Sequence, residues 1–306
     1  LDLRNGILKA LKFLFKEHGR ADTLVFLPGE REIMDIAAFL KKAHLPNTEI
    51  LPLYARLATA EQNKIFSPHS TVRVVLCTNV AETSLTVPGI KYVIDPGTAR
   101  ISRYSPRTKV QRLPVEKISK ASANQRKGRC GRVSEGVCVR LYSQEDFLSR
   151  PKFTDPEILR TNLAAVILQM VALHLGNITK FPFIDPPQMR QVTDGIRLLE
   201  EVGAINDAKG KGTDEIELTK IGVALSKIPA DPRLSRMLVQ ADKEGALSEV
   251  LVIVSALAVM DPRERPLDKQ EQSRQAHHRF DDEKSDFLSY LNLYKYICQL
   301  QTKMSN

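Results

Sequence analysis

The chain lacks the loop and the acidic cluster with which proteins hold a nucleoside triphosphate and its metal ion. Its 306 residues contain no G-x-x-x-x-G-K-[ST] sequence and no acidic metal-binding box. The chain therefore cannot hold ATP and Mg²⁺ by itself. A membrane-spanning helix needs about 18 consecutive apolar residues, and no apolar run in this sequence is that long. We therefore expect no membrane association.

Cysteine pairs are also missing. The four cysteines, Cys77, Cys130, Cys138 and Cys298, are scattered along the chain without a C-x-x-C sequence. This pattern is typical of proteins in a reducing compartment and argues against a zinc site. We expect a cytoplasmic protein in which this chain alone forms no metal site.

The sequence begins at Leu1 without an initiator methionine, and we expect no signal peptide within it. It ends at Asn306, in a helical pattern without a cap. Both ends lead us to expect a piece of a longer protein. The length of 306 residues still predicts more than one domain.

Acidic residues are scarce in one part of the chain. Residues 101–140 contain eleven Lys and Arg but only two Glu, so this window alone carries the net charge of +9. A basic block on an otherwise balanced chain predicts a polyanionic partner, although a solvated charged face would have the same composition.

In the first 150 residues, short apolar stretches alternate with amphipathic helical patterns. The predicted strands cover residues 23–27, 50–54, 72–77, 91–94 and 137–141. This alternation predicts a parallel α/β sheet flanked by helices. The turns at 28–29, 78–79 and 95–97 then lie at the carboxyl edge of the sheet, where such sheets bind ligands.

After residue 150 the pattern becomes mainly helical. One helix is predicted from Asp155-Pro156 to Gly176 and another from Asp185-Pro186 to Gly203. A turn-rich tip at residues 208–213 follows between short strands, which together predicts a winged helix. Further helices are expected to begin at Thr219, Asp231, Ser248 and Asp286.

The octapeptide at residues 125–132 has the composition of a phosphate-binding surface. Arg129 and Arg132 are three residues apart, so on a helical turn both could reach one phosphate cluster. Guanidinium groups bind phosphoryl oxygens bidentately, and Gly128 and Gly131 allow close backbone approach. The alternative is a basic helix start that pairs with acidic residues.

Three other turns carry weaker signals. Residues 78–86 follow a strand and are rich in small hydrogen-bonding side chains, which suits phosphate binding but also ordinary helix capping. Residues 27–32 form another strand-to-helix turn, and residues 95–107 form a hairpin-like excursion with basic flanks. Each signal alone is weak, and their order along the chain is the informative feature.

That order resembles the second RecA-like domain of DEAH-box helicases of superfamily 2. Residues 24–33 are similar to motif IV, residues 78–86 to motif V and residues 125–132 to motif VI. The stretches at 95–97 and 104–107 resemble the hairpin that follows motif V in this family.

The second half of the chain extends the resemblance. Residues 156–163 and 185–187 are similar to parts of the family's winged-helix domain. The Leu-Thr-Val-Pro-Gly-Ile sequence at 85–90 and the Asp-Pro-Arg-Glu-Arg-Pro sequence at 261–266 resemble the bacterial HrpA-type branch. The resemblance implies a RecA-like domain at 1–152, a mainly α winged-helix domain at 153–222 and a truncated ratchet-like helical bundle at 223–306.

The resemblance also implies roles for single residues at the nucleotide. Gln125, Arg129 and Arg132 would face the triphosphate of ATP, with the two arginines as arginine fingers. Thr86 would lie near the ribose, and Phe66 would stack on the base.

A second set would contact nucleic acid. Thr78 and Asn79 would bind the backbone, Gly29 would offer its amide, and Arg103 and Arg107 on the hairpin would attract phosphates.

The chain departs from the family pattern at three positions. Pro88 stands where the family often has an acid that reaches the ribose, so we expect that contact to be absent. Lys127 and Cys130 stand where small alanines are common. We expect Cys130 to pack in the interior and Lys127 to point outward.

The function implied is the C-terminal part of an ATP-dependent RNA helicase. ATP and Mg²⁺ would bind only with a second RecA-like domain N-terminal to this chain, so the chain alone should not hydrolyse ATP. Single-stranded RNA and that domain are the expected partners, and a ribosome or another ribonucleoprotein is a candidate.

Two alternatives remain. A DNA helicase of the same superfamily would use the same backbone contacts, which carry no base code. A non-catalytic RNA-binding module would keep the fold but lose motif VI, whereas Gln125, Arg129 and Arg132 are all present.

Overall fold

The chain forms two compact units in the computed structural model. The structure describes residues 2–83, 85–105, 107–132, 134–206, 216–259, 261, 263 and 269–304. Unit 1 contains Leu1–Arg103 and Arg112–Asp155, and unit 2 contains Tyr104–Gln111 and Pro156–Asn306. The three-domain division at residues 152 and 222 stays a prediction.

Unit 1 is built on a parallel sheet with the strand order β2-β3-β1-β4-β9. Its strands are β1 (Thr23–Phe26), β2 (Thr48–Leu53), β3 (Val72–Cys77), β4 (Tyr92–Asp95) and β9 (Val137–Arg140). Buried apolar side chains cover both faces of the central strands, as expected of a parallel sheet between helices. This architecture confirms the predicted fold class.

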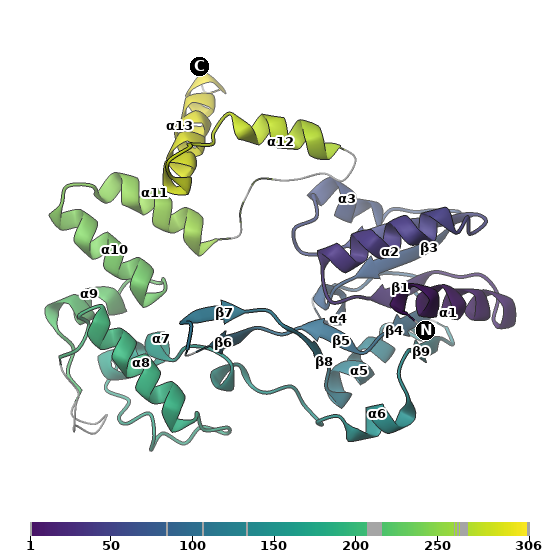
Figure 1. Cartoon of the computed structure of the whole chain (residues 1–306), viewed down its shortest axis with the longest axis horizontal. Helices are drawn as coiled ribbons and strands as arrows, with labels where there is room; N and C mark the ends of the chain where they lie inside the picture. The colour runs from purple at the N-terminus through teal and green to yellow at the C-terminus, as the bar shows by residue number, and fades with distance from the viewer. Residues whose placement is uncertain are drawn as a thin grey trace. The chain divides into compact units, whose positions relative to one another are not determined.

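Helices cover both faces of this sheet (Figure 1). They are α1 (Leu3–Glu17), α2 (Glu30–Lys42), α3 (Thr59–Lys64), α4 (Val80–Thr83), α5 (Lys120–Lys127) and α6 (Gln144–Ser149). The helices α1 and α2 bury their apolar faces on one side. On the other side, Ala81 of α4 and Cys130 after α5 pack into a cluster with Phe26 and Val93.

Sequence patterns located all five strands of this sheet but missed four short ones. These are β5 (Thr98–Arg100), β6 (Arg103–Ser105), β7 (Val110–Arg112) and β8 (Val115–Lys117), which pair as β5-β8 and β6-β7. Each has three residues, and most of these residues are not buried. They therefore lack the apolar run that reveals a core strand.

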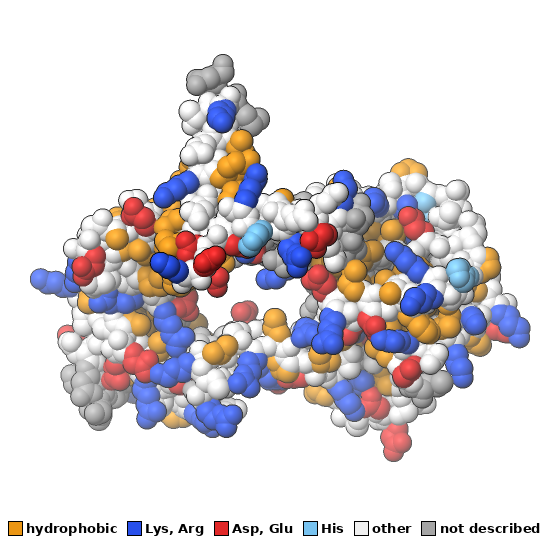
Figure 2. Space-filling view, turned by 45° about the horizontal axis from the view of Figure 1, so that its top comes forward, with side chains coloured by type: hydrophobic (Ala, Val, Ile, Leu, Met, Phe, Trp, Pro, Cys, Tyr) orange, Lys and Arg blue, Asp and Glu red, His pale blue; other side chains and the backbone are white. Residues whose placement is uncertain are grey.

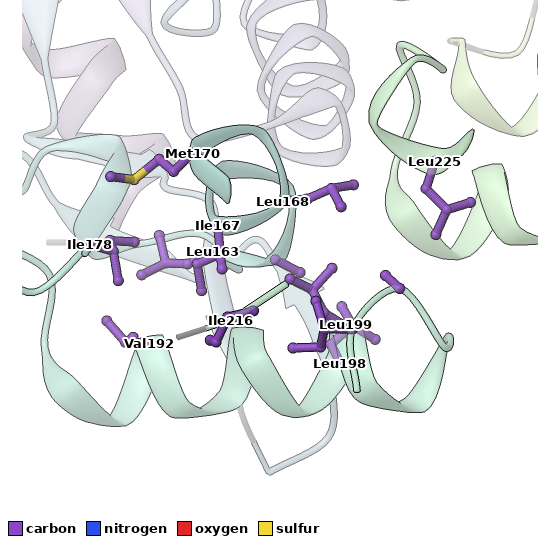
Figure 3. Packing of buried hydrophobic residues seen from close by; sticks show 13 residues of the cluster. Leu163, Ile167, Leu168, Met170, Ile178, Val192, Leu198, Leu199, Ile216 and Leu225 are labelled. Carbon is purple, nitrogen blue, oxygen red and sulfur yellow. The ribbon is translucent and has the colours of Figure 1, made fainter. Parts of the chain in front are cut away.

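Unit 2 is mainly helical. Its elements include a short 3₁₀ helix (Glu157–Leu159), α7 (Ala164–Ala172), α8 (Met189–Glu201), α9 (Lys220–Ser226), α10 (Pro232–Lys243), α11 (Leu247–Ala258), α12 (Gln270–His278) and α13 (Asp286–Met304). Figure 3 shows the core between α7 and α8, where Leu163 and Ile167 lie opposite Val192.

Two predicted helix starts in unit 2 were wrong. Asp155-Pro156 precedes only the short 3₁₀ helix, and α7 begins later, where the Asn162 side chain accepts a 2.8 Å hydrogen bond from Ala164 N. Asp185-Pro186 likewise does not open α8, whose cap is Gln188. In contrast, Thr219 and Asp231 cap α9 and α10 as predicted.

Some predictions fall on residues outside the described part of the chain. The basic tip at 208–213 is one of them, and the bridge between Ile205 and Leu218 is the only described pairing near it. None of the described helices is both long enough and apolar enough to cross a membrane.

Candidate nucleotide and nucleic-acid site

The predicted site residues of unit 1 lie at two opposite edges of the sheet. Gly29 follows β1, and Thr78 and Asn79 follow β3, so these three are at the carboxyl edge. The loop with Arg129 and Arg132 instead leads into the start of β9, which pairs with the start of β4 at the amino edge. The sequence did not predict this separation.

Arg132 and Thr86 are brought together by the fold. The Arg132 Nη1 atom donates a 2.9 Å hydrogen bond to Thr86 Oγ1, and its Nε donates to Gly128 O at 3.3 Å. Both residues are exposed. An arginine and a hydroxyl side by side on an open surface present several donors to an anionic ligand.

Arg129 lies close to Arg132. Burial of its guanidinium group and the nearby positive charge of Arg132 lower the pKa of Arg129 from its usual value. Its Nε atom is buried and has no hydrogen-bond partner in the described part of the chain. Two like charges held together with an unsatisfied donor are unfavourable alone, and a phosphate group would stabilise them.

The loop that carries the arginines depends on two glycines. Gly131 has φ of +76°, a conformation that other residues adopt only with strain. A Cβ atom on Gly136 would lie 2.5 Å from Gly131 N and 2.9 Å from Lys91 O, so the loop packs directly on the start of β9. Gly128 has φ of −69° and shows no such requirement.

Cys130 anchors the same loop from inside. It is buried in the core cluster of unit 1, and burial raises the pKa of its thiol. Lys127 beside it is exposed. These two of the three residues that depart from the family pattern thus take the positions expected for them, one packed in the core and the other facing solvent.

Gln125 and Phe66 lie apart from the arginine pair. Gln125 is exposed near the end of α5, one turn before Arg129. Phe66 is 40% exposed, and Arg73 Nη1 holds its loop near the start of β3 through a 2.9 Å hydrogen bond to Ser67 O. The starts of β3 and β9 are three strand positions apart, about 14 Å at the usual spacing.

The carboxyl edge has a different chemistry. Gly29 is the N-cap of α2, and a Cβ atom there would lie 2.6 Å from Arg100 Nε. Arg100 Nη2 donates to Glu32 Oε1 at 3.3 Å. Thr78 follows β3 directly, where its N–H donates to Leu53 O at 3.2 Å, and Asn79 leads into α4.

A buried arginine links α5 to α4 and to the end of β4, and no sequence pattern predicted it. Arg126 on α5 has a fully buried side chain whose Nη1 donates to Asp95 Oδ1 at 2.8 Å, while its Nε donates to Glu82 Oε2 at 3.0 Å. The guanidinium carbon also lies 4.7 Å from the centre of the Phe26 ring. Burial alone would lower the pKa of Arg126, but the two carboxylates outweigh it and raise that pKa.

This network ties α4 to α5. Ser122 Oγ donates to the other oxygen of Glu82 at 2.5 Å, so one carboxylate holds two residues of α5. The helix α4 begins directly after Thr78 and Asn79, and α5 leads into the arginine loop. The network therefore fixes the arginine loop relative to the carboxyl edge.

The two hairpin arginines have different surroundings. Arg103 makes a bidentate ion pair with Glu116 at 2.6 and 2.8 Å and a second pair with Asp155 at 2.9 Å. Its charge is thus already compensated. Arg107 belongs to unit 2 and is exposed, with no ion-pair partner in the described part of the chain.

The donor set at the amino edge fits the phosphates of ATP but not its metal ion. Guanidinium groups and a hydroxyl suit phosphoryl oxygens, whereas Mg²⁺ requires oxygen ligands such as carboxylates. Among the described residues, no three His, Cys, Asp or Glu side chains gather where they could hold a metal ion. Ligands for Mg²⁺ would have to come from outside this group of residues.

Comparisons with known proteins agree with this architecture. A family model described as the helicase conserved C-terminal domain matches residues 6–134, and one described as a ratchet-like helicase associated domain (HA2) matches residues 231–290. The crystal structure of the Escherichia coli DExH-box NTPase HrpB has a TM-score of 0.74 and 28% identity, over 91% of this chain and 35% of that one.

The similarity to several named relatives covers nearly the whole chain. The ATP-dependent RNA helicase HrpA of Escherichia coli (strain K12) is 61% identical over 100% of this chain and 23% of its own length. A homolog of HrpA from Haemophilus influenzae is 60% identical over 99% of this chain and 23% of its own length. Human DHX35, a probable ATP-dependent RNA helicase, is 35% identical over 92% of this chain and 41% of its own length.

The chain thus spans about a quarter of the length of its HrpA relatives. The matched domains, the identity to HrpA and the likeness to HrpB confirm the resemblance seen in the motifs, and the chain belongs to the HrpA-type family of DEAH-box helicases.

Proposed function

We propose that this chain is the part of an ATP-dependent RNA helicase that supplies the arginine fingers and half of the RNA track. The observation that carries the proposal is the pair of arginines at the amino edge, where Arg132 bonds to Thr86 and Arg129 keeps an unsatisfied donor. Arginines in this arrangement stabilise the charge that develops on a transferred phosphoryl group.

In this proposal the two edges of the sheet have separate tasks. At the amino edge, Arg129, Arg132 and Gln125 hold the triphosphate and Thr86 lies at the ribose. Phe66 lies in the loop that leads to β3, whose start is about 14 Å from the start of β9 by strand spacing. Its half-exposed ring would then stack on the base through its π-face, which recognises no single base.

At the carboxyl edge, Thr78, Asn79 and the Gly29 amide contact the RNA backbone. The network around Arg126 couples the two tasks, because it joins α4, which follows Thr78 and Asn79, to α5, which leads into the arginine loop. A change in the triphosphate contact would then be transmitted to the RNA contact through packed side chains and ion pairs.

Mg²⁺ and the other phosphate contacts would come from a second RecA-like domain of the whole protein, which would close over the amino edge. Residues 153–222 would form a winged helix and residues 223–306 a ratchet-like bundle. A cytoplasmic location and a ribonucleoprotein partner belong to the same proposal.

The isolated chain should show no ATP turnover above background. In this proposal the remaining phosphate contacts belong to the second RecA-like domain, and no group of described residues could hold the metal ion, so neither the nucleotide nor the attacking water would be positioned. Phosphate release at millimolar ATP and Mg²⁺, with and without RNA, measures this. Turnover that disappears in the Arg132→Ala variant would contradict the proposal.

A DNA helicase remains the second candidate, because the carboxyl-edge contacts are to the backbone. Matched RNA and DNA strands in a binding titration separate the two. A non-catalytic module is disfavoured, since Arg129 and Arg132 sit together with unused donors that a purely structural role does not explain.

A further inference from the structure

A second basic site lies in unit 2, away from the sheet. A hollow of about 400 Å³ is lined by Arg107, Met189, Arg190, Thr193, Asp194 and Arg197. Arg107 comes from the β6-β7 hairpin and the other five from α8. Figure 2 shows Lys and Arg side chains gathered on the visible face of this unit.

The fold of α8 explains why its arginines are available. Val192, Gly195, Leu198 and Leu199 are buried, and Figure 3 shows this side of the helix packed against α7. Arg190 and Arg197 are both exposed, so they lie on the outer side of α8. They are seven residues apart, which places them about 10 Å from each other along the helix axis.

Two hydrogen bonds and an ion pair hold the hairpin within unit 2. Tyr104 N donates to Arg160 O at 2.7 Å, and Arg233 Nη1 donates to Lys109 O at 3.2 Å. Lys109 also pairs with Glu201 at the end of α8. These contacts all lie within unit 2, so the position of Arg107 beside α8 is set by the fold of this unit.

The positive charge of the hollow is only partly compensated from within. No described residue forms an ion pair with Arg107, Arg190 or Arg197. The one acid in the lining, Asp194, accepts hydrogen bonds from Asn162 Nδ2 at 3.4 Å and from Tyr104, and it offsets one of the three positive charges. Three exposed guanidinium groups and one carboxylate leave the lining with a net positive charge, which attracts an anion.

We propose that this hollow binds the backbone of single-stranded RNA, an inference that rests on the proposed function. Arginines about 10 Å apart on one helix suit an anion with repeated phosphates better than a single phosphate group. Met189 is 64% exposed in the same lining and offers apolar surface to a base or ribose. A phosphodiester strand carries both features, whereas an acidic peptide supplies only the charge.

The test uses the full chain and a 12-nucleotide oligouridylate. The double variant Arg190→Ala/Arg197→Ala removes two exposed arginines of the hollow. The control Lys227→Ala/Lys243→Ala removes the same charge from exposed positions of unit 2 outside the lining. Affinity is measured as a function of salt for the wild type and both variants, with circular dichroism to verify folding.

The arginine variant should bind RNA roughly tenfold more weakly at low salt, because two charge-assisted contacts are lost. Its log–log salt slope should fall by about 1.4, or 0.7 for each phosphate on a single strand. The lysine control should stay within about twofold of the wild type, since distant charges are screened. Arg107→Ala, on the other element, should weaken binding in the same direction.

Three outcomes would overturn the inference. Equal affinity and slope in the arginine and lysine variants would show that the hollow takes no part in RNA binding. If the arginine variant lost binding to oligoglutamate but bound RNA like the wild type, the hollow would be assigned to an acidic protein segment. Absence of RNA binding by the wild type would refute the RNA track of the proposed function together with this site.

Discussion

Replacing Arg132 or Arg129 with alanine in the whole protein should lower ATP turnover about a thousandfold or more, the usual effect of removing an arginine finger. The reason is electrostatic. Each guanidinium group would stabilise negative charge on the transferred phosphoryl group, and Arg129 already keeps a donor without a partner. Steady-state phosphate release with saturating RNA measures the effect.

A matched control is Lys127→Ala, which removes a neighbouring exposed charge from the same segment. It should leave turnover nearly unchanged. Arg132→Lys is also informative, because lysine keeps the charge but cannot make the fork of hydrogen bonds. Near-normal turnover in Arg132→Ala or Arg129→Ala would mean that the amino edge is not the nucleotide site.

Arg126→Ala should destabilise unit 1 by about 3–5 kcal/mol, the usual consequence of leaving buried charges without their partner. Both Asp95 and Glu82 would lose their ion pair with Arg126, and Asp95 is fully buried. Urea unfolding followed by circular dichroism measures the free energy of unfolding.

The control for this prediction is Arg4→Ala. Arg4 also forms a bidentate pair, with Asp35, but both side chains are about half exposed. Its loss should cost about 1 kcal/mol or less, as for other surface pairs. The double variant Arg126→Ala/Asp95→Asn should lose less than the sum of the two single variants, because the residues interact directly. Similar effects of Arg126→Ala and Arg4→Ala would refute the structural role of the network.

The core of unit 1 could be predicted from the sequence because each central strand is a short, nearly continuous apolar run. Helix starts were predicted where a strong capping residue is used, as at Thr219 and Asp231. At residues 155–156 and 185–186, by contrast, the Asp-Pro sequence predicted the start of an α-helix that begins only later in the structure. The residues that mark the starts of α7 and α8 are Asn162 and the capping box of Gln188 with Gln191.

The site was only partly visible in the sequence. The motifs predicted Arg129 and Arg132 as a pair, and the structure places them close together. Arg126 was missed, because an arginine is expected at the surface and its burial depends on two acids that are 31 and 44 residues away. Arg190 and Arg197 were missed as well, because their partner in the hollow, Arg107, comes from a hairpin far away in the sequence.

The division of labour between the two edges of the sheet is tested most directly by comparing Arg132→Ala with Asn79→Ala in the whole protein. RNA affinity and ATP turnover without RNA are measured for both. We expect Arg132→Ala to lose turnover while its RNA affinity stays close to that of the wild type. We expect Asn79→Ala to bind RNA more weakly and to keep its turnover without RNA. Loss of RNA affinity in Arg132→Ala, together with intact RNA affinity in Asn79→Ala, would contradict the account.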